Sequence, residues 1–127
     1  MSTEIKYFTP TGANKTLPLV KKIVSDILST AREIRLLTED YGDAATDNPK
    51  IAKLMNDLNS FLKELEEIGC YYKDPNFKIG LVDFPSIIDG REVYLCWRSD
   101  EDEILYYHDI ESGYLGRKLI PPEYFLE

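Results

Sequence analysis

The stretch IAKLMNDLNSFLKELEEIGC at residues 51–70 holds the most regular helical pattern in the chain and the residue that ends it. Its seam positions are separated by three and four residues in alternation, as in a coiled coil: Ile51, Leu54, Leu58, Phe61, Leu65 and Ile68. Gly69 is suited to the left-handed position that follows a helix. Beyond it the apolar spacing changes to two, which is typical of strands. The stretch therefore predicts a helix followed by a sheet.

A second amphipathic helix precedes this one. Thr9 is a suitable N-cap and Pro10 suits the first helical position. The apolar positions that follow have helical spacing: Leu17, Val20, Val24, Ile27, Ala31, Ile34 and Tyr41. Pro18 removes a helical hydrogen bond, so we expect a kink or a restart there, with Asn14 helping to satisfy the disturbed turn. The segment GDAATDNP at residues 42–49 is a connection in which Asn48 or Asp47 caps the next helix. The two helices predict an antiparallel hairpin over residues 9–69.

Strand patterns occupy the remainder of the chain. We expect strands at residues 70–73, at 78–84 closed by Pro85, at 92–98, at 103–110 and at 118–120, with a turn at Asp89-Gly90. The predicted fold class is α+β: an N-terminal long antiparallel helical hairpin followed by a small antiparallel β-sheet, a meander, packed on it. Residues 1–127 are expected to form a single domain with its sheet region at about 70–120.

Composition and charge exclude several functions. The formal net charge is −8, and residues 70–127 carry 6 basic against 12 acidic side chains, which argues against binding nucleic acid or anionic lipid. No apolar run approaches the length of a membrane span, and the stretch MSTEIKYFTP is not a signal peptide. Cys70 and Cys96 form no disulfide or metal-binding pattern, and we interpret them as buried free thiols. The expected location is cytoplasmic.

The hairpin GREVYLCWRSDEDEILYYHDIESGYLGR, residues 90–117, contains the only Trp and the only His. Alternation places Val93, Leu95 and Trp97 on one face, which is the better core face. The connecting loop does not fix the register, so His108 is expected beside either Tyr94 or Val93.

His108 has a structural and a catalytic interpretation. It is either a hydrogen-bonded histidine beside a strand, or a general acid/base oriented by Asp83, Asp109 or Glu111. Cys96 is either inert packing or a nucleophile paired with His108. A metal site made of His108, Asp109 and Glu111 is unspecific, and we predict neither a bound metal nor a cofactor.

The arginines of the acidic half form the other candidate cluster. Arg91, Arg98 and Arg117 either pair with neighbouring acidic residues or form a bidentate clamp for a carboxylate or phosphate. Trp97 and the tyrosines are core residues in one interpretation and an aromatic wall of a ligand pocket in the other. The ligand-binding candidates are therefore Arg91, Trp97, Arg98, His108 and Arg117.

Three functional hypotheses follow. The first is an oligomeric module that binds a small anionic ligand at the Arg/His residues of the sheet. The second is a scaffold or interaction protein that uses its helical hairpin, because the stripe widened by Ile23, Leu28, Met55 and Leu62 exceeds what one seam needs. We expect self-association, a homodimer, through these helices. The third is an enzyme in which His108 acts as acid/base with Asp83 or Asp109.

Three strings carry a family resemblance: YFTPTGANKTLPLV at residues 7–20, GLVDFPSIIDGREVYLCWR at 80–98 and YHDIESGYLGR at 107–117. Together they resemble the uncharacterised bacterial family known as domain of unknown function 2203, over nearly the whole chain. The resemblance implies a small bacterial protein and implies no activity.

Overall fold

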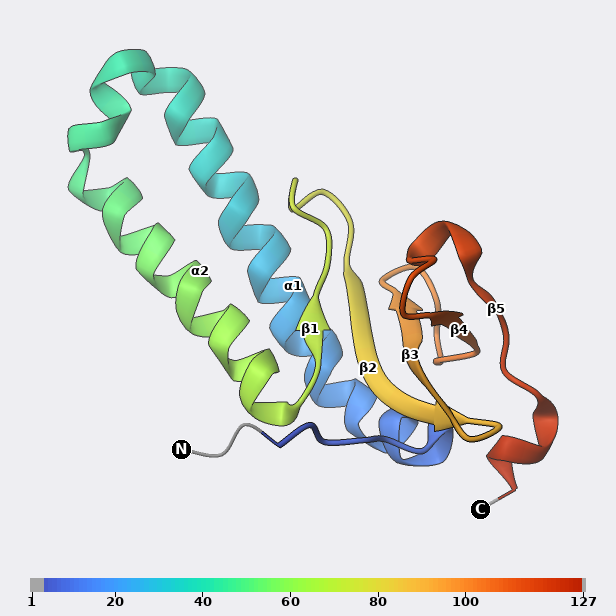
Figure 1. The fold of residues 1–127 in the computed structure, drawn as a ribbon. Coiled ribbons are helices and arrows are strands. Elements are labelled where there is room, and N and C mark those ends of the chain that lie inside the picture. Colours follow the sequence, from blue (N-terminus) through green and yellow to red (C-terminus); the bar gives the residue numbers. More distant parts are fainter. Residues whose placement is uncertain (1–3, 127) are drawn as a thin grey trace.

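The structure, a computed structural model, describes residues 4–126 apart from the side chains of Asp43 and Thr46 (Figure 1). Two long helices are followed by five strands, with three short 3-10 helices between or after them. In chain order the elements are α1 (Pro10–Tyr41), η1 (Gly42–Asp47), α2 (Pro49–Ile68), β1 (Tyr71–Tyr72), β2 (Leu81–Ile88), β3 (Arg91–Arg98), β4 (Tyr106–Asp109), η2 (Tyr114–Gly116), β5 (Lys118–Leu119) and η3 (Pro122–Phe125). The α+β prediction is confirmed.

Helix α1 begins as predicted and passes Pro18 without interruption, so the expected restart is wrong. The Thr9 side chain accepts a hydrogen bond from the Gly12 amide at 3.0 Å. Pro18 lies on the exposed side of the helix, where water can satisfy the carbonyl that lost its donor. The Asn14 side chain bonds both within α1 and outside it. Its amide nitrogen donates to the Pro10 carbonyl and, at 3.2 Å, to the Ile104 carbonyl, and its amide oxygen accepts from the Ile104 N–H at 2.7 Å. It therefore ties α1 to the loop before β4.

Helix α2 has the predicted ends but only part of its seam is buried. The Asn48 side chain accepts from the amides of Lys50 and Ile51, and Gly69 ends the helix with φ of 110°. Of the six seam positions only Ile51 and Leu65 are buried, and the other four remain half-exposed. None of the helices within residues 4–126 combines the length and apolar character needed to cross a membrane.

The five strands form an antiparallel meander in the order β1-β2-β3-β4-β5, as predicted. Asp89 and Gly90 both have positive φ and form the two-residue turn between β2 and β3. The expectation that Pro85 closes a strand is wrong, because β2 continues to Ile88. The Pro85 carbonyl accepts from the Phe8 amide at 2.8 Å, so this residue directs its backbone away from β3. Its missing N–H therefore costs the β2–β3 ladder nothing.

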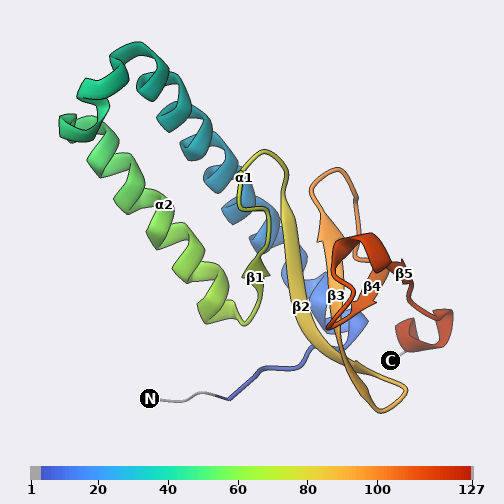
Figure 2. The same ribbon diagram turned by 45° about the horizontal axis from the view of Figure 1, so that its top comes forward.

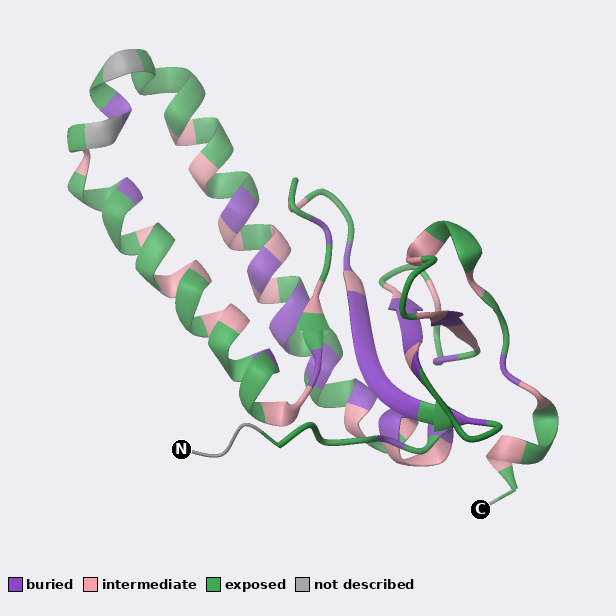
Figure 3. Ribbon diagram, in the orientation of Figure 1, coloured by how far each residue is buried: buried purple, intermediate pink, exposed green. Residues whose placement is uncertain are grey.

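Helix α1 covers one face of the sheet, and α2 lies beside α1 next to β1 (Figures 1 and 2). Val93, Leu95 and Trp97 are at most 2 % exposed, so the predicted core face is confirmed. Buried residues line α1 and most of β2, whereas much of the far end of the hairpin is exposed (Figure 3). A Cβ on Gly80 would lie 2.6 Å from Val24 Cγ1, because α1 approaches the strand closely at this point.

The loop between β1 and β2 is organised by Asp74. Its carboxylate accepts from the amides of Asn76, Lys78 and Ile79 at 3.0, 2.8 and 2.9 Å. Burial alone would raise the pKa of Asp74, but the three amide donors more than offset this effect and lower it.

We expect Asp74→Ala to reduce the free energy of unfolding by about 1–3 kcal/mol, because three loop amides lose their acceptor. Asp74→Asn should lose less, since one carbonyl oxygen remains. The wild-type contribution is present above the unfolded pKa of about 3.9 and is lost as pH falls through the lowered folded pKa. Urea unfolding measures the loss, with Asp57→Ala as the control because Asp57 forms an exposed pair with Lys53. Equal losses in the two alanine variants would contradict this role for Asp74.

Candidate functional site

Three polar side chains are buried on the sheet face opposite α1. Asp83 pairs with Cys96 in the β2–β3 register, and Tyr94 pairs with His108 in the β3–β4 register. The alternation of side chains along each strand therefore places Asp83, Cys96 and His108 on one face. They are 4, 1 and 2 % exposed. The register also settles that His108 lies beside Tyr94, with ring centroids 5.7 Å apart.

Both ring nitrogens of His108 face acceptors. Nε2 lies 3.1 and 3.2 Å from the two carboxylate oxygens of Asp83, and Nδ1 lies 2.8 Å from the Asp109 carbonyl. A neutral imidazole carries only one N–H, so this arrangement favours the imidazolium. Burial alone would lower the pKa of His108, but the Asp83 hydrogen bond and charge, with the Asp109 carbonyl, raise it. The result is a buried ion pair that joins β2 to β4 across β3.

Of the acids predicted to orient His108, Asp83 contacts the ring through its carboxylate. Asp109 contributes only its backbone carbonyl, because its carboxylate pairs with Arg91 at 2.6 Å. With both nitrogens engaged and the ring 2 % exposed, His108 in this state has no nitrogen available to a substrate.

The Cys96 thiol is not activated in this environment. Burial, with the nearby charge of Asp83 as the next cause, raises its pKa to about 12. The neutral thiol is a poor nucleophile, which favours the packing interpretation of Cys96. Cys70, the second free thiol, is also buried and has its pKa raised to about 12 by burial.

The three predicted arginines each have their own carboxylate. Arg91 pairs with Asp109, and Arg98 with Asp100 at 2.5 Å and with the hydroxyl of Tyr114. Arg117 Nη2 lies 2.8 Å from both carboxylate oxygens of Glu101. Trp97 points into the core on the opposite face, and its Nε1 donates to the Glu101 carbonyl at 2.8 Å. The structure thus brings Asp83 and His108 together but does not gather the five ligand-binding candidates around them.

Among the residues that the structure describes, those with atoms placed to hold a metal are Asp83, Cys96 and His108. One ligand atom from each lies within 4.8 Å of the other two. Only His108 belongs to the metal site weighed from the sequence, which combined it with Asp109 and Glu111; Asp83 and Cys96 were not assigned to it. The three come from three strands, so only the register could have identified the set.

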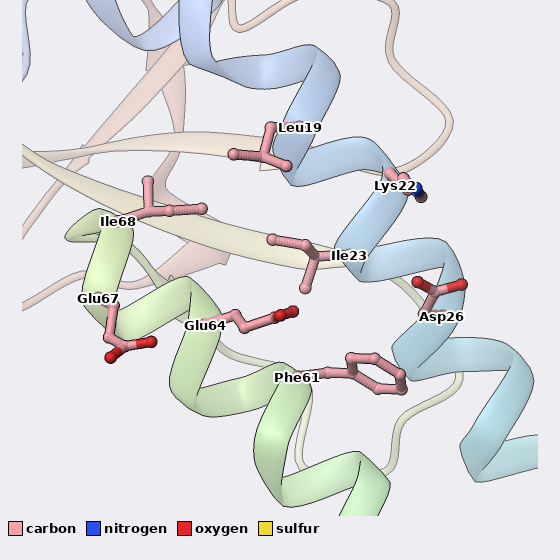
Figure 4. A pocket seen from close by; sticks show the side chains of 8 residues that line it. All are labelled: Leu19, Lys22, Ile23, Asp26, Phe61, Glu64, Glu67 and Ile68. Atoms are coloured by element: carbon pink, nitrogen blue, oxygen red, sulfur yellow. The ribbon is translucent and has the colours of Figure 1, made fainter.

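An open groove lies between α1 and α2, with a volume of about 440 Å³. Apolar side chains from the two helices extend toward one another across it (Figure 4): Leu19, Ile23, Phe61 and Ile68. Leu19 is 53 % exposed, and Phe61 and Ile68 are half-exposed. Lys22 and Asp26 of α1 and Glu64 and Glu67 of α2 complete the lining. None of these four charged residues has an ion pair within residues 4–126.

The fold, the buried His–Asp pair and the groove between the helices define a class. It is an α+β protein in which a helical hairpin with an open groove packs on an antiparallel meander that buries a His–Asp pair. The family model described as "Uncharacterized conserved protein (DUF2203)" matches residues 6–120. The chain therefore belongs to this family, as the resemblance predicted. Neither the comparison with curated proteins nor that with solved structures gives a match.

Proposed function

We propose that the protein is an interaction module that associates with a second copy of itself through the helical hairpin. The observation that carries the proposal is the apolar groove between α1 and α2, which one copy leaves open. Leu19 is exposed, and Phe61 and Ile68 beside it are half-exposed. Burying these side chains in an interface would stabilise the dimer by about 25 cal/mol per Å² of apolar area.

The hairpin is long enough for such an interface. Helix α1 has 32 residues, a length of about 48 Å, and its distal part extends beyond the sheet together with α2 (Figures 1 and 2). A stable interface buries roughly 1,200 Å² or more, which two paired hairpins can supply as a four-helix bundle.

One pairing of opposite charges around the groove fits a second copy as the occupant. Lys22 and Asp26 lie on α1, Glu64 and Glu67 lie on α2, and none of the four has an ion pair within the described chain. In a two-fold interface, any contact from α1 of one copy to α2 of its partner occurs twice. Lys22 of each copy can then pair with a glutamate of the other.

The other hypotheses have less support from the geometry. An anion site at Arg91, Arg98, His108 and Arg117 would have to displace the carboxylates that already pair with each cation. An acid/base role for His108 would require the closed pair with Asp83 to open. The free state of both cysteines supports the expected cytoplasmic location.

Leu19→Glu should convert a dimer into a monomer, because it places a carboxylate in the apolar groove beside Glu64 and Glu67. Sedimentation equilibrium should give twice the 14.7 kDa chain mass for the wild type and the chain mass for the variant. Leu115→Glu is the matched control, because Leu115 is a leucine at 94 % exposure in η2, outside the hairpin. It should remain a dimer.

A wild-type mass of 14.7 kDa from micromolar to millimolar concentration would overturn the proposal. Equal dissociation of both variants would place the interface elsewhere and would also contradict it. Circular dichroism of each variant checks that the hairpin remains folded.

A further inference from the structure

We infer that Asp83, Cys96 and His108 form a binding site for a divalent transition-metal ion of the Zn²⁺ class. The inference concerns the buried face of the sheet and does not depend on self-association through the helices.

The three ligand atoms have suitable separations. Atoms no more than 4.8 Å apart can all lie within 4.8/√3, about 2.8 Å, of one point between them. Zinc bonds are about 2.3 Å to sulfur and about 2.0–2.2 Å to nitrogen and oxygen, so the side chains need to close by about half an ångström. Nε2 and the Asp83 oxygens are already at 3.1 and 3.2 Å, a separation that two ligands of one tetrahedral ion have.

The orientation of His108 is that of a metal ligand. A ligating histidine usually donates its second N–H to a carbonyl or carboxylate, which fixes the tautomer and the ring plane. Nδ1 of His108 faces the Asp109 carbonyl at 2.8 Å, so the proton at that position can stay while Nε2 gives up its own. The imidazole is therefore already held with Nε2 toward Asp83.

The charge of the site selects a divalent ion. In the metal-free Asp83–His108 ion pair, protonated His108, ionised Asp83 and the neutral Cys96 thiol sum to zero charge. A divalent ion that displaces one proton from Nε2 and one from the Cys96 thiol leaves two anionic ligands and two positive charges, which again sum to zero. The exchange of two protons for one ion therefore places no net charge in a buried site. A thiolate ligand favours zinc over magnesium or calcium.

The site adjoins the surface through two tyrosines. Tyr71 pairs with Asp83 and Tyr94 pairs with His108, and both tyrosines line a depression of about 110 Å³ on this face. None of the three proposed ligands lines this depression, so an ion that enters from it has to pass between the two tyrosines to reach them.

Titration of the chelator-treated full chain with Co²⁺ tests the inference, because a cobalt–thiolate bond has its own near-ultraviolet charge-transfer absorption. We expect one Co²⁺ per chain, displacement by Zn²⁺ and release of two protons per ion in weakly buffered solution. Cys96→Ser should abolish the charge-transfer band. Cys70→Ser is the matched control, since Cys70 is an equally buried free thiol outside the set, and it should keep the band.

Absence of the band in the wild type overturns the inference, and this result needs no variant to fold. A band that survives Cys96→Ser but disappears in Cys70→Ser overturns it as well. A band lost only with Cys96→Ser, together with release of two protons, supports it. Sedimentation with and without Zn²⁺ separates this inference from the proposed dimer, whose mass should not depend on the metal.

Discussion

His108→Ala is expected to lower the free energy of unfolding by about 3–5 kcal/mol, measured in urea with a chelator present. The reason is the carboxylate left behind: Asp83 is 4 % exposed, and the His108 ring is its buried cationic partner in the structure. The cost of removing one member of a buried ion pair comes mainly from the unpaired charge that remains.

A double-mutant cycle identifies this cause. Adding Asp83→Asn to His108→Ala removes the stranded charge, so the double variant should be less destabilised than the sum of the single variants. Additive losses would contradict the ion pair and would leave only a packing role for the ring.

The same pair predicts the direction of the pH dependence. The pKa of His108 is raised above its unfolded value of about 6.5, so the folded protein holds this proton more tightly. Its stabilising contribution is complete below pH 6.5 or so and is lost as pH rises through the folded pKa. Wild type should therefore lose stability over this interval relative to His108→Gln, which has no proton to release. Equal pH profiles for the two proteins would contradict the raised pKa.

The helical part of the fold was predictable because its signals are local. Thr9 and Asn48 cap the helices as their residue types predict, and Gly69 ends α2 with positive φ. The prediction that Pro85 closes a strand was wrong, because a proline ends a strand only where the neighbouring strand needs a backbone N–H at that position. Here the backbone at Pro85 faces the Phe8 segment instead of β3.

The buried cluster was predictable only in part. The two-residue turn at Asp89-Gly90 sets Ile88 opposite Arg91. Counting five residues away from the turn along each strand places Asp83 opposite Cys96. The next connection is a longer loop, so the position of His108 relative to β3 could not be deduced. The loop between Arg98 and Tyr106 takes its shape from long-range contacts. Asn14 binds the Ile104 backbone, and Arg117 binds Glu101.

Arg117→Ala is expected to cost about 3 kcal/mol, because it leaves Glu101 without its cation in a site that excludes most water. The side chains of Arg117 and Glu101 are 12 and 16 % exposed, and the guanidinium also lies 4.0 Å from the centre of the Tyr106 ring. Arg117→Lys should lose an intermediate amount, since an ammonium keeps the charge but not the planar contact with Tyr106.

Arg91→Ala is the matched control for this pair. Arg91 and Asp109 are 67 and 37 % exposed, so their ion pair should contribute only about 0–1 kcal/mol. Fluorescence of Trp97, the only tryptophan, adds a local readout, because its Nε1 donates to the Glu101 carbonyl. The Arg117→Ala spectrum should shift before global unfolding, whereas the Arg91→Ala spectrum should match wild type. Equal losses of stability in the two variants would mean that burial does not strengthen the Arg117–Glu101 pair.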